Sequence, residues 1–223
     1  MIVLGIETSS SVCGAGLASE NGCLAEFRIQ RKNAHAEIVS DTVNTMLHYS
    51  GVDKSMLTAV AVSLGPGSYT GLRIGLAVAK GLAFGWEISI VGVPTMEAVL
   101  AVVPAVFSSV TVLSEARKEE VFLGTFSQQD GTWKPEHKPC PVMVNKLPET
   151  INGDCPVLAG QGASRHRDFL KKSFPKGVFL DDCIGVPGGY HIAKKGVEMI
   201  RRGKKDSVDS LLPNYLRSYM GEM

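Results

Sequence analysis

The first 30 residues alternate between short apolar runs and turn residues. The small polar residues of 8-TSSS-11 separate the first two runs, and Asn21-Gly22, a dipeptide typical of tight hairpins, separates the second and third. This alternation predicts a meander of three β-strands. The strands are expected at residues 2–6, 12–18 and 23–29.

Two longer segments have helical character, with a strand between them. Residues 35–51 place Ile38, Val39, Val43, Met46 and Leu47 on one face at helical spacing, and Gly51 stands just past the expected end. The run 58–65 is continuous in small and β-branched residues, as in a strand covered on both faces.

The second helical segment, residues 71–85, is apolar almost all round. Its only charges, Arg73 and Lys80, lie seven residues apart, about 20° from each other around a helix. The remaining positions are apolar or glycine, which predicts a helix buried on more than one side.

The remaining sequence predicts a second, smaller lobe after Pro104. A strand at 88–93 and a helix at 95–103 complete an α/β lobe of residues 1–103. Residues 104–223 are expected to form an α+β lobe, and its final helix is free to pack back on the first lobe. The elements expected beyond Pro104 are strands at 109–116, 120–127 and 157–160, a proline-punctuated stretch at 134–156, a basic helix at 165–174 and an amphipathic helix at 191–203.

Charge is balanced overall but not along the chain. The net charge is +1, yet residues 165–205 hold eleven Lys and Arg against four Asp and Glu, whereas residues 1–164 hold eleven against fifteen. Two interpretations of the basic stretch stay open, contact with nucleic-acid phosphates and an ordinary solvated helix face. A hydrophobic content of 44% over 223 residues allows a substantial core.

The five cysteines are widely spaced and never form a C-x-x-C pair, which argues against a disulfide framework or a zinc site. The N-terminal segment has no basic region before Glu7, so it does not look like a signal peptide. The apolar run 98–107 is interrupted by Pro104 and is too short to span a bilayer. These features predict a cytoplasmic protein that does not associate with membranes.

The glycine-rich segment 63-SLGPGSYTGLRIGLAVAKGLA-83 does not match a nucleotide-binding loop. A P-loop requires a lysine directly after its last glycine, and here Arg73 follows Gly71 two positions later. The spacing also departs from the dinucleotide-binding fingerprint. Gly71, Gly75 and Ala79 recur every four residues, which predicts a flat seam where another helix approaches closely.

Five segments closely resemble the TsaB (YeaZ) family, and the similarity runs from one end of the chain to the other. They are the 63–83 segment, with its specific GPGSYTGLRIG block, 2-IVLGIETSSSVCGAGLA-18, 33-NAHAEIV-39, 115-EARKEEVF-122 and 213-PNYLR-217. The resemblance implies the actin-like, Hsp70-like and sugar-kinase-like ATPase fold, with two lobes of mixed sheets flanked by helices. It also implies a non-catalytic role beside the related TsaD subunit in forming threonylcarbamoyladenosine at position 37 of tRNAs that read ANN codons.

The same resemblance implies no catalytic residue and no metal. The catalytic relative carries H-x-x-x-H, whereas here Val39 stands four residues after His35. The turn between the first two strands corresponds to a phosphate-binding turn of the fold and leaves weak ATP or ADP binding open, without an expected cofactor; its candidate residues are Glu7, Ser9, Ser10 and Ser11. A plain hairpin is the alternative. Peptidase motifs such as H-E-x-x-H or G-x-S-x-G are absent.

The two apolar helices are therefore expected to pack against the like pair of a TsaD-type subunit, or against a second copy when that partner is absent. A TsaE-type ATPase completes the expected complex, and residues Arg165 to Lys205 are the candidate tRNA contact. An autonomous ATPase or small-molecule kinase that uses the turn at residues 7–11 is the alternative function. The candidate partner-binding residues are Ile38, Thr42, Met46, Tyr49, Leu72, Gly75, Leu76, Ala79 and Leu82.

Overall fold

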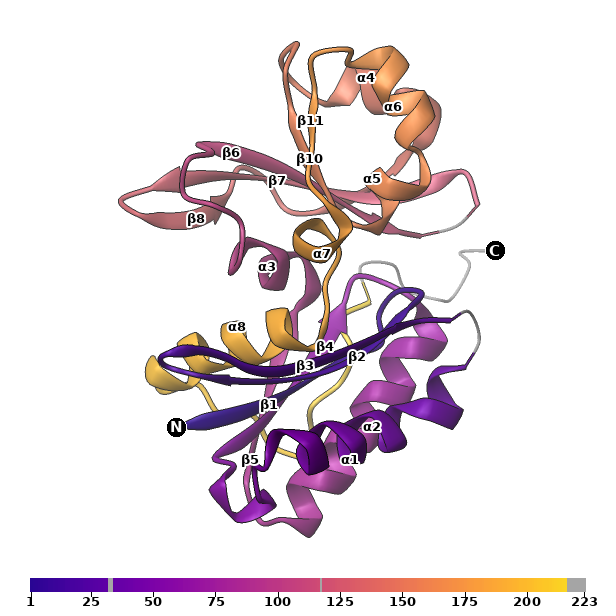
Figure 1. The fold of residues 1–223 in the computed structure, drawn as a ribbon. Coiled ribbons are helices and arrows are strands. Elements are labelled where there is room, and N and C mark those ends of the chain that lie inside the picture. Colours follow the sequence, from indigo (N-terminus) through magenta and orange to yellow (C-terminus); the bar gives the residue numbers. More distant parts are fainter. Residues whose placement is uncertain (32–33, 117, 216–223) are drawn as a thin grey trace. The chain divides into compact units, whose positions relative to one another are not determined.

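The computed structural model describes residues 1–31, 34–116 and 118–215 (Figure 1). The chain divides into two compact units. Unit 1 comprises Met1–Ala101 and Pro187–Pro213, and unit 2 comprises Val102–Val186 together with Asn214 and Tyr215.

Unit 1 is built on a sheet of five strands in the order β3-β2-β1-β4-β5. The first three strands form the predicted antiparallel meander, whereas β4 and β5 run parallel to β1. Almost every residue of β1, β2 and β4 is buried, which explains why these strands read as continuous apolar runs. The strands are β1 (Ile2–Glu7), β2 (Val12–Ser19), β3 (Gly22–Gln30), β4 (Ala59–Gly65) and β5 (Ser89–Pro94).

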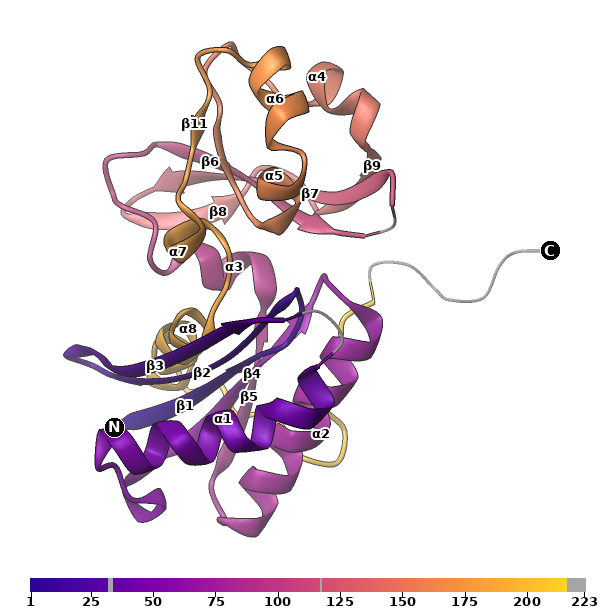
Figure 2. The ribbon, with the colours of Figure 1, turned by 45° about the vertical axis from the view of Figure 1, so that its right-hand side comes forward.

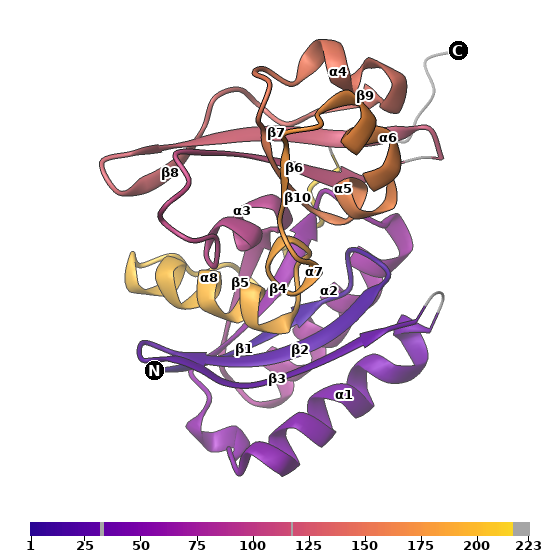
Figure 3. The same cartoon turned by 45° about the horizontal axis from the view of Figure 1, so that its top comes forward.

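Helices cover both faces of this sheet. Helices α1 (His35–Ser50) and α2 (Tyr69–Gly85) lie on one face, and α8 (Gly189–Arg201) with α3 (Thr95–Leu100) lies on the other (Figure 3). The backbone of α8 comes so close to β2 that a Cβ on Gly16 would collide with the main chain of Gly189 and Tyr190. A short 3-10 turn, η1 (Lys54–Met56), precedes β4.

The ends of the two long helices follow the sequence signals. Ser68 caps α2, because its hydroxyl accepts a 3.2 Å hydrogen bond from the Gly71 amide. Gly51 follows α1 with φ +67°, a left-handed conformation that glycine adopts readily.

Unit 2 contains a sheet in the order β11-β10-β6-β7-β8, with β9 also paired to β7 (Figure 2). Its core is a cluster of large apolar side chains that includes Leu113, Leu123, Leu158 and Leu170. Its strands are β6 (Ser109–Glu115), β7 (Glu120–Gln129), β8 (Thr132–Pro135), β9 (Cys140–Met143), β10 (Val157–Ala159) and β11 (Val178–Phe179). Its helices are η2 (Val144–Lys146), α4 (Leu147–Thr150), α5 (Gln161–Arg165), α6 (Arg167–Ser173) and α7 (Asp182–Gly185).

The final helix packs on unit 1, an arrangement that the sequence left open: residues 187–213 group with this unit, because the apolar face of α8, with Ile192 and Ala193, packs against Val3 and Ala61. Two other expectations need correction. Helix α3 ends at Leu100, and the basic helix expected at 165–174 is divided at His166 between α5 and α6. The quoted segments that resemble the TsaB family also include Asn33, Arg117, Leu216 and Arg217, which lie outside the described residues.

Candidate functional site: the α1–α2 surface and the β1–β2 turn

The small-residue seam of α2 faces the interior of unit 1. The Thr8 hydroxyl donates a 2.8 Å hydrogen bond to the carbonyl oxygen of Gly71, and a Cβ on Gly75 would collide with the same hydroxyl. Ala79 is fully buried. The prediction that a partner helix approaches this seam is therefore corrected: the β1–β2 turn of the same chain fills it.

The other candidate partner-binding residues fall into two groups. Thr42, Met46, Leu72 and Leu76 are buried, so with Gly75 and Ala79 they belong to the core of unit 1. Ile38 and Leu82 are half-buried against that core, and Tyr49 is 75% exposed. These six residues are buried within unit 1 and are not accessible to a partner in the described structure.

A different stripe of α2 faces outward. Ala77, Gly81 and Phe84 are exposed, Phe84 to 78%, and Ile74 and Val78 are half-buried beside them. These five residues, here called the outer stripe, recur every three or four positions and so share one face of the helix. The sequence pattern did not distinguish this face, because a helix that is apolar all round gives no sign of which side turns inward.

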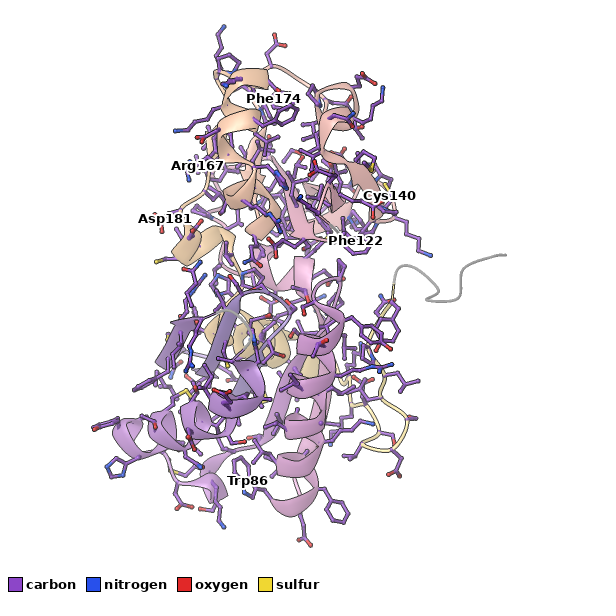
Figure 4. The ribbon with its side chains drawn as sticks, turned by 90° about the vertical axis from the view of Figure 1, so that its right-hand side faces the viewer. Trp86, Phe122, Cys140, Arg167, Phe174 and Asp181 are labelled. Atoms are coloured by element: carbon purple, nitrogen blue, oxygen red, sulfur yellow. The ribbon has the colours of Figure 1, made fainter. Side chains whose placement is uncertain are left out.

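Other features border the outer stripe. At the start of α2 the guanidinium of Arg73 lies 3.9 Å from the ring centre of Tyr69. At the other end, Trp86 follows the helix (Figure 4). A shallow groove of about 510 Å³ lies between Trp86 and the end of α1, where it is also lined by His48, Asp53 and Lys54.

The β1–β2 turn uses several of its hydrogen-bonding groups internally. The Glu7 carboxylate accepts a short hydrogen bond from the Ser9 amide, and the Ser10 hydroxyl accepts a 3.1 Å bond from the Val12 amide. The Ser9 carbonyl accepts a 2.7 Å bond from the Ser68 amide. An anion-binding turn must offer its amides to the ligand, and here the Ser9 amide is already paired with a carboxylate of the same chain.

Glu7 itself is an unusual acid. It is fully buried, and burial raises its pKa from 4.5 to about 7, opposed by the hydrogen bond from Ser9 and by the charge of Arg28. Its second carboxylate oxygen has no hydrogen-bond partner in the structure. The group is thus poised to change its protonation state near neutral pH.

His35 is held as a structural residue at the start of α1. It is 8% exposed, and its Nε2 lies 3.2 Å from the carbonyl oxygen of Val12. Val39, one helical turn later, is buried in the core. Within residues 1–31, 34–116 and 118–215, no three His, Cys, Asp or Glu side chains are grouped so as to hold a metal ion.

The basic stretch from Arg165 to Lys205 is divided between the two units. In unit 2, Arg165 pairs with Glu115 at 2.9 Å. Arg167, labelled in Figure 4, lies 5.2 Å from the ring centre of Phe179. In unit 1, Lys195 pairs with Glu97 at 3.3 Å. Several of these charges therefore have partners within their own unit, whereas Arg201 and Arg202 at the end of α8 are exposed.

Comparison with known proteins decides the family. Residues 23–176 match the family described as TsaD: tRNA N6-adenosine threonylcarbamoyltransferase. The chain belongs to this family. The tRNA threonylcarbamoyladenosine biosynthesis protein TsaB of Escherichia coli is 28% identical over 225 residues, which span 98% of this chain and 95% of that protein. The resemblance to TsaB inferred from the sequence is confirmed.

Solved structures of proteins with low sequence identity to this chain have the same fold. YeaZ from Pseudomonas aeruginosa superimposes with a TM-score of 0.77 at 21% identity, covering 96% of this chain and 99% of YeaZ. A chain of the PilM–PilN type IV pilus biogenesis complex superimposes with a TM-score of 0.54 at 10% identity, covering 87% of this chain and 98% of that one. The predicted actin-like ATPase fold is therefore confirmed. Among the described helices of this family member, none is both long and apolar enough to cross a membrane.

Proposed function

We propose that this chain is a non-catalytic subunit that binds a TsaD-type transferase during threonylcarbamoylation of adenosine 37 in tRNAs that read ANN codons. The family match and the TsaB relatives support the tRNA-modifying role. The observation that carries the binding role is the outer stripe of α2, an exposed apolar helix face inside an otherwise well-packed unit.

The proposed interface combines the outer stripe with the exposed side of α1. Ala77 and Gly81 are small enough to let a partner helix approach closely, and the exposed rings of Phe84 and Tyr49 supply large apolar contacts. Of the original candidates, Tyr49, Ile38 and Leu82 remain in this interface. The same surface is proposed to hold a second copy of the chain when the partner is absent.

Two features support a non-catalytic role. The Ser9 amide at the β1–β2 turn is paired with Glu7 and is not offered to a phosphate. In addition, the position one turn after His35 is the buried Val39, which has no metal-ligating atom. Any ATP or ADP binding at Glu7, Ser9, Ser10 and Ser11 would require these internal hydrogen bonds to rearrange.

An omission experiment tests the role. Purified tRNA, threonylcarbamoyl-adenylate, TsaD-type and TsaE-type subunits and ATP are combined with and without this chain, and modified adenosine is measured. We expect modification to require the chain, and the chain alone to leave ATP intact. Equal modification without it would contradict the proposal. ATP hydrolysis by the chain alone that is lost on Ser9→Ala would instead favour an autonomous ATPase or small-molecule kinase.

A matched pair of variants tests the surface. Gly81→Arg places a charge in the outer stripe at a position where a Cβ meets no atom within 4 Å, so the fold should tolerate it. We expect binding to the TsaD-type subunit to weaken at least about tenfold, whereas Ala105→Arg, at an exposed position of unit 2, should bind as the wild type does. Undiminished binding by a folded Gly81→Arg chain would exclude this face.

The basic stretch is the proposed tRNA contact. Arg201 and Arg202 are the clearest candidates because they are exposed at the end of α8. Reversing both charges to Glu should lower tRNA affinity and its salt dependence, since each lost phosphate contact removes part of the counterion release. Unchanged affinity at two salt concentrations would leave tRNA binding to the partner subunits.

A further inference from the structure

A cavity of about 310 Å³, here called the unit 2 cavity, lies against one end of the β6–β7 pair. Leu113 and Leu123 are opposite each other in this pair and belong to the apolar core of unit 2. Thr111 and Thr125 are the next opposed pair on the same face, since side chains alternate along a strand, and both line the cavity. Hydroxyl groups therefore replace apolar side chains where the core ends and the cavity begins.

The fold does not use all the hydrogen-bonding capacity of these hydroxyls. Thr111 is 4% exposed, and its Oγ1 lies 3.3 Å from Oγ1 of Thr125. One hydroxyl hydrogen is enough for this contact, so the second hydroxyl hydrogen and the remaining lone pairs are available to a ligand. Ser109, two residues before Thr111 and so on the same face, also lines the cavity.

Loops of unit 2 add polar and apolar groups around this floor. Asn152 supplies an amide, and Glu136, directly after β8, supplies a carboxylate. The main chain at Glu136 is held in place, because its amide donates a 2.9 Å hydrogen bond to the carbonyl oxygen of Thr125. Phe107 and Pro156 offer apolar surface. A few convergent polar groups beside apolar ones are typical of small-molecule sites.

We propose that the unit 2 cavity binds a small uncharged polyhydroxylated molecule of about the size of a monosaccharide. Hydroxyl, amide and carboxylate groups match neighbouring hydroxyls of such a ligand, and the face of the Phe107 ring attracts its C–H groups. The volume lies at the lower end of the range of about 300–1,000 Å³ that ligand sites occupy, which favours a small molecule.

The charges around the cavity favour a neutral ligand. Among the described residues that line it, none is Lys, Arg or His, so an anion would lose hydration without gaining a counter-charge. The acid among them, Glu136, is exposed, and an exposed ion pair contributes little to the binding of a cation. The site uses residues of unit 2 alone and shares none with the outer stripe, so it is independent of the proposed function.

Protection of a native cysteine tests the site. Cys155 is exposed and lines the cavity, whereas Cys183, also exposed and also in unit 2, is not among the lining residues. The full chain is alkylated with iodoacetamide in the presence and absence of D-ribose, D-glucose or myo-inositol, and mass spectrometry gives the rate at each cysteine. A concentration of about 20 mM fills most of a site whose dissociation constant is about 1 mM. At least one of the three compounds should then slow alkylation of Cys155 several-fold and leave Cys183 unchanged.

Two variants examine the floor and the wall separately. The double variant T111V/T125V removes both partners of one hydrogen bond and keeps their shape, so its stability should be close to that of the wild type. It should weaken binding of the protecting compound about tenfold or more, because two hydroxyls that face the ligand are lost. Glu136→Ala changes an exposed side chain and should weaken binding about threefold or more. Thr132→Val, in β8 and outside the cavity, is the matched control and should bind as the wild type does.

Thermal unfolding checks that each variant is folded. Protection of Cys155 that weakens in the folded variants at Thr111, Thr125 or Glu136 and persists in Thr132→Val supports the proposal. Three results would overturn it. They are the absence of protection by all three compounds, protection that is undiminished in every folded variant of the cavity, and stronger protection by spermidine or citrate at the same concentration, which would indicate a cation or anion site instead.

Discussion

Replacing Glu7 by Gln should make the stability of this protein less dependent on pH. Glu7 is fully buried, and its pKa in the folded chain is raised to about 7 from 4.5. The folded state therefore holds a proton that the unfolded state releases over this range, so stability falls as the pH rises from about 4.5 to 7. A shift of this size corresponds to roughly 3 kcal/mol between the two ends of the window.

Gln keeps an oxygen that can accept from the Ser9 amide, but it carries no charge at any pH. We expect the free energy of unfolding of Glu7→Gln to lie within about 1 kcal/mol of the wild type near pH 5. At pH 8 the free energy of unfolding of Glu7→Gln should exceed that of the wild type by about 3 kcal/mol, because the wild-type carboxyl must then ionise in an apolar interior or force local opening.

Urea unfolding at half-unit steps from pH 5 to pH 9 measures this difference. Glu20→Gln, at an exposed position in the β2–β3 turn, is the control for the substitution itself. A flat difference for Glu7→Gln would show that the ionised carboxylate is fully compensated, for example by Arg28, and would refute the burial argument.

Two further predictions concern α2. Gly75→Ala should lower the free energy of unfolding by about 1–3 kcal/mol, because the added methyl group collides with the Thr8 hydroxyl. Gly81→Ala, on the open side of the helix, should raise the free energy of unfolding by up to about 1 kcal/mol. Thermal unfolding of the two variants measures both effects, and equal effects would contradict the assignment of inner and outer faces. Ser68→Ala should cost about 0.5–2 kcal/mol through loss of the cap on the Gly71 amide, and Thr70→Ala, at the exposed second position of the same helix, should cost less.

The first lobe could be predicted closely from local signals. The Asn21-Gly22 hairpin, the capping Ser68 and the terminating Gly51 each act within a few residues, so the sequence contains everything needed to place them. In contrast, the proline-punctuated stretch at 134–156 gave no periodic signal, and the structure builds the end of β8, together with β9 and α4, from it. Strand β8 forms a hairpin with β7, but β9 and α4 depend on pairing with β7 and on the core around Leu147, which are contacts more distant in sequence.

The partner-binding residues show the limit of pattern reasoning. The spacing of Gly71, Gly75 and Ala79 correctly indicated a close approach, but not what approaches; only the fold places Thr8 in that seam. Likewise, the sequence predicted a single basic region from Arg165 to Lys205, because these residues follow one another along the chain. The fold divides this region between the two units.

The sequence by itself determined the family, the fold class and the ends of the main helices, because the specific GPGSYTGLRIG block and the capping residues are local features of the chain. Tertiary structure alone decided which side of α2 is buried, that Glu7 sits unsolvated beneath the β1–β2 turn, and that α8 returns to the first unit. A helix with apolar residues all round has no intrinsic inward face, and the solvation of a carboxyl group depends on atoms contributed by segments far away in the sequence.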